Sequence, residues 1–327
     1  MKKRLKHLLL MAFVILNQAQ AIPFTGITES GSSARHIALG SIDGFSKGAD
    51  SIFETPAALY RIKTYALNSF SSSILGDFVH YNNLAIAGKF KEGSWAIGIC
   101  EVIHPNQPYT FFGQPMAHNR GGANYAEPQG IFDIKRSIIK AGYQYSPIET
   151  RHFGATINWY NDNMIDSVGR GWDIDLGVIQ EWNNLEISCT LKNGLKNRIY
   201  SKTQTYNQEK QEYITTYPTE DLSRELNISA KYIWKRLFIM PQIEFKRKKI
   251  MPSIGLEYTP WFFKQMTLYA GSESSLMPDN STKRRLSTGI GLNLGILTMY
   301  YAYKKSETPT TSLIENDQHH FSIEIIL

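Results

Sequence analysis

The sequence predicts an all-β chain that forms a transmembrane antiparallel β-barrel of about fourteen strands with an N-terminal plug-like segment. Three observations support this fold class. Many segments alternate apolar and polar residues, short and long connectors alternate between them, and an export signal opens the chain. A soluble β-sandwich also alternates in this way, so the connectors have to discriminate between the two folds.

The first 21 residues have the three parts of a secretory signal peptide. An apolar stretch from Leu8 to Leu16 precedes the small residues Ala19 and Ala21, and the basic start contains Lys2, Lys3, Arg4 and Lys6. The apolar stretch is too short for a membrane-spanning helix, which needs roughly 20 residues. We therefore expect residues 1–21 to be removed on export; an amphipathic amino-terminal helix is the alternative.

The net charge gives no support for nucleic-acid binding. The chain has 35 Lys and Arg against 29 Asp and Glu, and four of the basic residues lie in the predicted signal peptide. Its removal leaves 31 basic against 29 acidic residues, a formal charge of +2. A nucleic-acid-binding chain would be expected to carry a basic excess on its mature part.

Chemistry-bearing motifs are sparse. The two cysteines, Cys100 and Cys189, lie in separate alternating runs, which excludes a disulfide-rich secreted fold. Only the adjacent His319 and His320 approach a metal-ligand spacing, and no Gly-x-Ser-x-Gly elbow occurs. We expect no catalytic residues, no metal and no cofactor; an outer-membrane hydrolase that assembles its site from distant loops is the alternative left open.

The alternating segments carry charge in mid-strand on their polar face. In HFGATINWY, for example, Phe153, Ile157 and Trp159 share the face opposite Thr156 and Asn158. Charged residues on the polar face suit the lumen of a barrel whose other face meets lipid. The residues predicted to face the lumen are Asp173, Asp175, Glu186, Lys231, Glu257 and Glu324.

The connectors sort by length, as expected for an outer-membrane barrel. The short ones lie near residues 91–94, 146–151, 183–184, 235–236, 259–264 and 294–295. Those on the other side are mostly long, at residues 103–136, 193–224, 272–285 and 304–318, with shorter ones at 161–171 and 246–250. A sandwich has no reason to sort its loops in this way.

The last nine residues, HHFSIEIIL, alternate with Phe321, Ile323, Ile325 and Leu327 on one face. An exposed edge strand this regular would invite aggregation, so we expect it to close the barrel against a first strand near residues 62–70. We also expect the barrel-assembly machinery to recognise this strand.

The stretch before the first strand resembles the start of the PorV and PorQ proteins of type IX secretion and of the wider FadL-like outer-membrane proteins. Those proteins read Ala-Arg, Ala-Leu-Gly, Ala-Asp-Asp-Ala-Ser and Asn-Pro-Ala-Gly-Leu in order; here Thr55 replaces the Asn and Ala58 the Gly. The matching residues are Ala34, Arg35, Ala38, Leu39, Gly40, Ala49, Asp50, Ser51, Thr55, Pro56, Ala57 and Leu59.

The resemblance continues through GWDIDLGVI, RELNISAKYIW and LSTGIGLNLGILTMYYAYKKSE, and so runs from about Ser33 to the end. It implies a fourteen-stranded barrel formed by residues 62–327, with residues 22–61 as a plug or periplasmic segment. It also implies a conduit or scaffold for hydrophobic or lipid-bearing cargo. A secretion accessory that binds secreted proteins through long loops, and a general diffusion pore, are the alternatives.

Contacts with the membrane are also predicted. The six tryptophans, the clearest being Trp261 beside Phe262 and Phe263, fall where interfacial girdles lie. Basic clusters at the predicted outer rim would attract lipopolysaccharide phosphates, with ordinary solvated loop charge as the alternative. These lipopolysaccharide-contact candidates are Lys246, Arg247, Lys248, Lys249, Lys283, Arg284 and Arg285.

Overall fold

The computed structural model describes residues 31–74, 79–109, 130–164, 167–207, 212–276, 282–306 and 318–327. The predicted signal peptide, residues 1–21, and the first part of the predicted plug, residues 22–30, lie outside these ranges. Among the described residues, no helix is both long enough and apolar enough to span a membrane.

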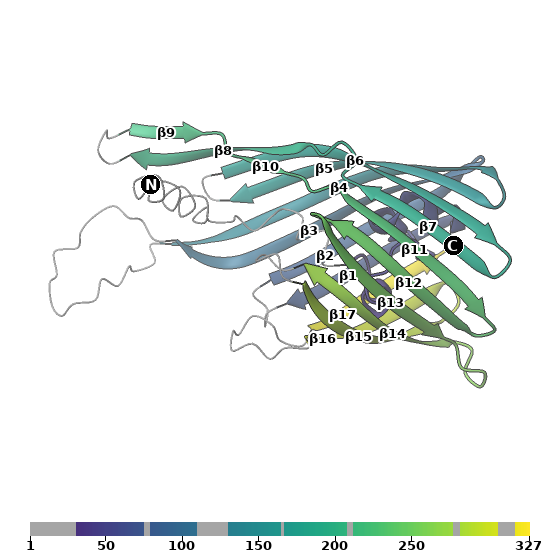
Figure 1. Cartoon of the computed structure of the whole chain (residues 1–327). Coiled ribbons are helices and arrows are strands. Elements are labelled where there is room, and N and C mark those ends of the chain that lie inside the picture. The colour runs from purple at the N-terminus through teal and green to yellow at the C-terminus, as the bar shows by residue number, and fades with distance from the viewer. Residues whose placement is uncertain are drawn as a thin grey trace, which may run out of the picture.

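The described chain forms one sheet of 17 strands, of which all but β8, β9 and β10 make a closed wall. The wall therefore has 14 antiparallel strands (17 less three), as the sequence predicted (Figure 1). They are β1 (Tyr65–Ile74), β2 (Val79–Phe90), β3 (Gly93–Tyr109), β4 (Gly130–Ile148), β5 (Arg151–Met164), β6 (Ser167–Trp182), β7 (Leu185–Lys192), β11 (Glu225–Trp234), β12 (Leu237–Lys246), β13 (Lys249–Tyr258), β14 (Met266–Leu276), β15 (Thr282–Asn293), β16 (Leu297–Ser306) and β17 (Gln318–Ile326).

Closure joins the two ends of the wall. Strand β17 pairs with β1 in antiparallel register, from Ala66 opposite Ile326 to Ser73 opposite His319. Because the terminal strand gains a partner on each side, no wall strand is left with a free edge along this pairing. The first strand begins at Tyr65, slightly later than the predicted start at residue 62.

Side chains alternate between the exterior and the interior of the wall. Ile157 on β5 is 62 % exposed, whereas its neighbours Thr156 and Asn158 are 1 % and 0 % exposed. Leu256 and Ile254 on β13 are likewise exposed, whereas Glu257 is buried. A closed ring of strands satisfies the backbone hydrogen bonds of every strand, which a lipid bilayer requires. An apolar exterior is the surface that suits contact with lipid.

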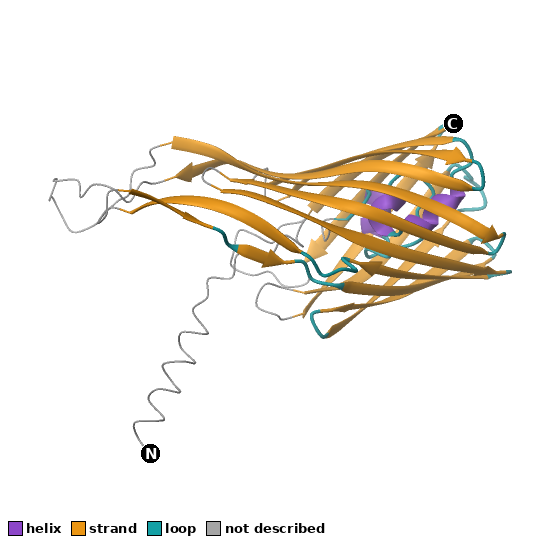
Figure 2. Ribbon diagram, turned by 90° about the horizontal axis from the view of Figure 1, so that it is seen from above, coloured by secondary structure: helices purple, strands orange, loops and turns teal. Residues whose placement is uncertain are grey.

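The two ends of the barrel differ. Tight connections at residues 91–92, 149–150, 183–184 and 235–236 lie at one end, together with the C-terminus; we call this the short-turn end (Figure 2). At the opposite end, here the long-connection end, β3 and β4 extend beyond their neighbours. Residues 103–109 and 130–136 were predicted as loop. They belong to strands, because the β3–β4 hairpin continues beyond the ends of the neighbouring strands.

The connection between β7 and β11, predicted as a loop over residues 193–224, also contains strands. They are β8 (Arg198–Asn207), β9 (Glu212–Thr216) and β10 (Thr219–Asp221). Strand β8 pairs with β6, whereas β7 pairs with β11, the next strand of the wall. The sheet is thereby carried past the wall at the long-connection end (Figure 1).

Residues 32–62 lie inside the barrel, in its short-turn half, and form α2 (Ala34–Ala38), α3 (Ser51–Glu54) and the 3-10 helix η2 (Pro56–Arg61) (Figure 2). We call this segment the plug. Ser33 caps α2 by accepting a hydrogen bond from the His36 amide at 3.3 Å. Its apolar side chains, which include Ile37, Leu39 and Phe45, are buried against wall residues, and each stabilises the fold by roughly 2 kcal/mol relative to exposure.

Candidate functional site

The plug rests on wall glycines that we call the glycine row: Gly255, Gly271 and Gly289 on β13, β14 and β15. A Cβ atom on Gly255 would stand 2.5 Å from the carbonyl oxygen of Leu39, and one on Gly271 would overlap the backbone at Gly40. Glycine is needed where another backbone approaches this closely. The Ala38-Leu39-Gly40 motif is therefore held by backbone contact with the row.

A second contact of the same kind holds the other end of the plug. Gly154 on β5 and Gly177 on β6 are register partners, and their missing side chains leave room for Thr55, Pro56 and Ala57. The position where the resembling proteins carry Asn is thus against the wall. Thr55 is buried there, and its hydroxyl makes no hydrogen bond within the described chain.

Two ion pairs, one buried and one partly buried, join plug arginines to wall carboxylates. Arg35 Nη2 lies 2.6 Å from Glu257, and its Nη1 donates to the carbonyl of Phe45 at 3.0 Å. Arg61 Nη2 lies 2.5 Å from Glu186, which also binds Lys231 on β11 at 2.6 Å. Three of the residues predicted to face the lumen, Glu186, Lys231 and Glu257, therefore lie at the plug interface.

The other predicted lumen residues have separate partners. Asp175 pairs with Lys140 at 2.6 Å, and Asp173 accepts hydrogen bonds from the backbone amides of Leu195 and Asn197 at 3.0 and 2.9 Å. These two carboxylates thus hold the start of the connection that leads to β8. Glu324 accepts a hydrogen bond from Tyr300 at 2.7 Å.

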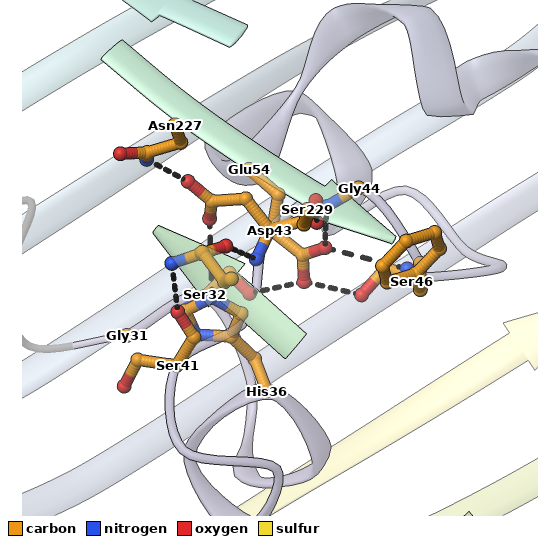
Figure 3. Close-up of polar contacts among 12 residues, drawn as sticks. Gly31, Ser32, His36, Ser41, Asp43, Gly44, Ser46, Glu54, Asn227 and Ser229 are labelled. Carbon is orange, nitrogen blue, oxygen red and sulfur yellow. Dashed lines mark hydrogen bonds and ion pairs between the residues drawn. The ribbon is translucent and has the colours of Figure 1, made fainter. Parts of the chain in front are cut away.

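Asp43 is the plug residue with the most polar partners. Its carboxylate lies 3.2 Å from His36 and accepts a hydrogen bond from the Asn227 amide (Figure 3), and it also lies 2.7 Å from Lys192. Burial alone would raise the pKa of Asp43, but Lys192 and His36 together hold it below its ordinary value. Asp43 is therefore ionised and ties the plug to the wall.

A second buried group of carboxyls has no cation bonded to it in the described chain. Glu54 accepts hydrogen bonds from Ser32 at 2.7 Å, from the Gly44 amide at 3.2 Å and from the Ser46 hydroxyl (Figure 3), and Ser46 also lies 3.0 Å from Asp50. Burial, followed by the charges of Glu54 and Glu324, raises the pKa of Asp50 to about 7. One Asp50 oxygen has no hydrogen-bond partner among the residues that the structure describes.

The remaining motif residues pack within the plug or against the wall. Ala34 donates its backbone amide to Ser322 on β17 at 3.2 Å, and Ser51 donates its hydroxyl to the Gly48 carbonyl at 2.7 Å. Ala49 and Leu59 lie in an apolar cluster with Ala85 on β2. All the predicted motif residues are buried inside the barrel.

The end of η2 is clamped at the short-turn end. The rings of Tyr60 and His152 stack 3.6 Å apart, and the Tyr60 hydroxyl donates to Glu181. His152 in turn lies 2.7 Å from the Ser146 hydroxyl. These contacts fix Tyr60, a plug residue that the sequence analysis did not single out.

The basic clusters divide between the two faces of the wall. Lys246 points into the barrel and pairs with Glu225 at 2.6 Å, so its prediction as a lipopolysaccharide contact is wrong. The cause is alternation, which places Lys246 and its register partner Lys249 on the inner face. Arg247 and Lys248 form the β12–β13 turn; Arg284 is exposed, whereas Lys283 and Arg285 follow the inward positions of β15.

The tryptophan side chains lie on the outer face. Trp182, Trp234 and Trp261 are exposed at the short-turn end, where Phe262 is exposed as well. Trp159 and Trp172 are register partners on β5 and β6, further along the wall. Within the described ranges, no group of three or more His, Cys, Asp or Glu residues is arranged to hold a metal ion.

Fourteen wall strands enclosing an N-terminal plug form an architecture that can be compared with solved structures. Two toluene transporters have a similar fold. Pseudomonas putida TodX matches with a TM-score of 0.58 and 11 % identity, over 90 % of this chain and 96 % of that one. Ralstonia pickettii TbuX matches with a TM-score of 0.54 and 10 % identity, over 89 % and 96 %.

A mutant of the TodX monoaromatic hydrocarbon channel that lacks S2 and S3 matches equally well, with a TM-score of 0.57 and 12 % identity. Neither a family model nor a curated protein matches the sequence. At this level of identity the likeness establishes the fold, and function has to be argued from the site.

Proposed function

We propose that this chain is a plugged barrel of the bacterial outer membrane, of FadL-like type, that acts as a conduit or scaffold for hydrophobic or lipid-bearing cargo. One observation carries the proposal: a plug held by non-covalent contacts lies inside a barrel whose fold resembles that of two toluene transporters. The apolar exterior supports a place in lipid, and β17 would be the strand read by the assembly machinery.

Displacement of the plug is the step that this proposal requires. Apolar contacts, the two arginine pairs and the Asp43 group hold the plug, and none of these is a covalent bond. A change in a few polar contacts could therefore open a path without unfolding the wall, in which strands are joined by continuous ladders of hydrogen bonds.

A reversible cross-link between plug and wall tests this step. Ala34 and Ser322 touch across the interface, so Ala34→Cys and Ser322→Cys in a background with Cys100 and Cys189 replaced by Ser should form a disulfide. We expect toluene entry into Gram-negative host cells to fall on oxidation and to recover on reduction. Each single cysteine variant is the control, and equal entry in the oxidised and reduced states would reject a moving plug.

A second proposal, a secretion accessory of PorV type, rests on the sheet beyond the wall. Strands β3–β6 and β8–β10 project at the long-connection end and offer a large surface for a secreted protein (Figure 1). Replacing residues 198–221 with a short linker should abolish co-purification of such partners and leave toluene entry unchanged. Retained partners would reject this role.

A further inference from the structure

A cavity of about 100 Å³ lies over the plug, toward the long-connection end. The plug residues His36, Ser41 and Asp43 line one side, and strands β7 and β11–β15 supply the rest. Two of its lining residues, Met251 and Leu276, are apolar, and the others are charged or able to hydrogen-bond. A hydrophobic molecule would leave these groups without partners, so the cavity suits a polar ligand.

Most charges in this cavity are already neutralised. Lys192 pairs with Asp43 at 2.7 Å, and Lys246 pairs with Glu225 at 2.6 Å. Glu273 pairs with Lys304 on β16 and accepts a hydrogen bond from Ser41, and Arg285, the remaining lining cation, acts on the same carboxylate. Among the described residues, the carboxyl group of Glu244 forms no hydrogen bond and no ion pair; Lys192 and Lys246 lie near it, but each is paired with another carboxylate, Asp43 or Glu225.

Glu244 stands in the middle of the cavity wall. Its register partners are Asn227 on β11 and Met251 on β13, and both of them line the same cavity. The pairs formed by Lys192 and Lys246 hold the neighbouring cations in place. An unpaired carboxylate in such a site favours a positively charged ligand over an anion.

Asn227 provides a second, independent observation. Its side chain is 3 % exposed and donates to Asp43, but its amide oxygen accepts no hydrogen bond in the described chain. Ser275, another lining residue, has a hydroxyl oxygen that likewise finds no partner in the part of the chain that the structure describes. The cavity wall thus holds several acceptors that lack donors, which costs free energy unless a ligand supplies the donors.

We propose that this cavity binds a small molecule through its primary ammonium group, with Glu244 as the counter-ion and Asn227 as a further acceptor. An ammonium group carries a positive charge and three donors and no acceptor, which is the complement of these groups. The assignment goes beyond the conduit function, because it places a binding site for a polar cation on the side of the plug that faces the long-connection end. The ligand would lie against Asp43, which anchors the plug.

Calorimetry on the full-length mature barrel in detergent, with putrescine as the probe, tests the site. We expect saturable binding that Glu244→Gln weakens about tenfold or more, the usual effect of losing a hydrogen bond to a charged group. Glu244→Asp keeps the charge and should bind within a few-fold of the original chain. The matched control is Glu149→Gln, in an exposed turn at the short-turn end, which should change nothing.

Three results would overturn the assignment. One is the absence of saturable putrescine binding to the unmodified barrel, a measurement that does not depend on how any variant folds. The second is equal affinity for putrescine and for succinate, a dianion of similar length, and the third is equal affinity for putrescine in Glu244→Gln and the unmodified chain. Heat-modified mobility on gels confirms that each variant forms a closed barrel.

Discussion

At the scale of single residues, the plug is held by charges that are buried with their partners. Removing one partner of a buried pair leaves the other charged and unsolvated, which costs about 3–5 kcal/mol, whereas an exposed pair contributes about 1 kcal/mol or less. The structure offers both kinds: Arg35 with Glu257 inside the barrel, and Arg198 with Asp221 in the exposed extension.

Arg35→Met should therefore destabilise the folded barrel by roughly 3 kcal/mol, measured as the midpoint of urea unfolding in detergent. The double variant Arg35→Met with Glu257→Gln should recover part of that loss, because no carboxylate is left unpaired. Arg198→Met is the matched control and should change stability by less than about 1 kcal/mol. Equal losses in the two single variants would contradict this account.

The carboxyl group of Asp50 predicts a pH dependence. Its pKa is raised to about 7 in the folded chain, so folding favours the protonated form. The stabilising contribution is complete below the ordinary pKa of about 4 and is lost as the pH rises through about 7. The thermal midpoint should fall between about pH 4 and pH 7, and Asp50→Asn should flatten that slope. A slope unchanged by the substitution would show that other groups are responsible.

Residue identity also shows where sequence reasoning succeeds and fails. Alternation alone places Glu257 and Lys231 on the inner face, because the two sides of a strand are fixed by position. It does not show that Asp43 meets Lys192, because the two residues lie far apart in the chain and only closure of the wall brings them together. The misassigned Lys246 has the same origin, since the cluster Lys246–Lys249 reads as a surface run until its register is known.

At the scale of elements, the glycine row explains why small residues recur at the inner positions of β13–β15. In the sequence these glycines read as weak strand positions; the contact with Leu39 and Gly40 gives them their role. The plug helices themselves could not be predicted in detail. Helix α2 has five residues, which is too short for a periodic pattern, and its cap at Ser33 is satisfied only in place.

Gly271→Ala should displace the plug while the wall still forms, because the added Cβ would overlap the backbone of Gly40. We expect proteolysis to reach the plug more readily, by about tenfold, with unchanged heat-modified mobility of the barrel. Gly194→Ala is the control, since a Cβ there would make ordinary contacts with Ile174 and Leu191. Equal protease resistance in the two variants would show that the row does not position the plug.

At the scale of the whole molecule, the sorted connectors and the even strand count predicted the closed wall, and the structure confirms both closure and count. The extension by β8–β10 was missed, because short polar strands next to a long connection read as loop. The filled interior also bears on the diffusion-pore alternative: side chains of the plug pack against the wall where an open pore would hold water.

Planar-bilayer recording distinguishes a filled barrel from an open one. The unmodified chain should be nearly silent, and Gly271→Ala should show channel openings, because displacement of the plug frees the lumen. The oxidised variant with Ala34→Cys and Ser322→Cys should stay silent at every voltage applied. Steady, large conductance from the unmodified chain would instead support a general diffusion pore.

The contact between β1 and β17 has a consequence for biogenesis. The plug precedes the first strand along the polypeptide, yet it is surrounded by a ring that the last strand completes. The pairing of β1 with β17 must therefore stay open until residues 32–62 have entered the barrel. If these two strands paired first, the amino-terminal segment would be left outside. Residues 32–62 are therefore constrained by the order of assembly as well as by the stability of the folded barrel.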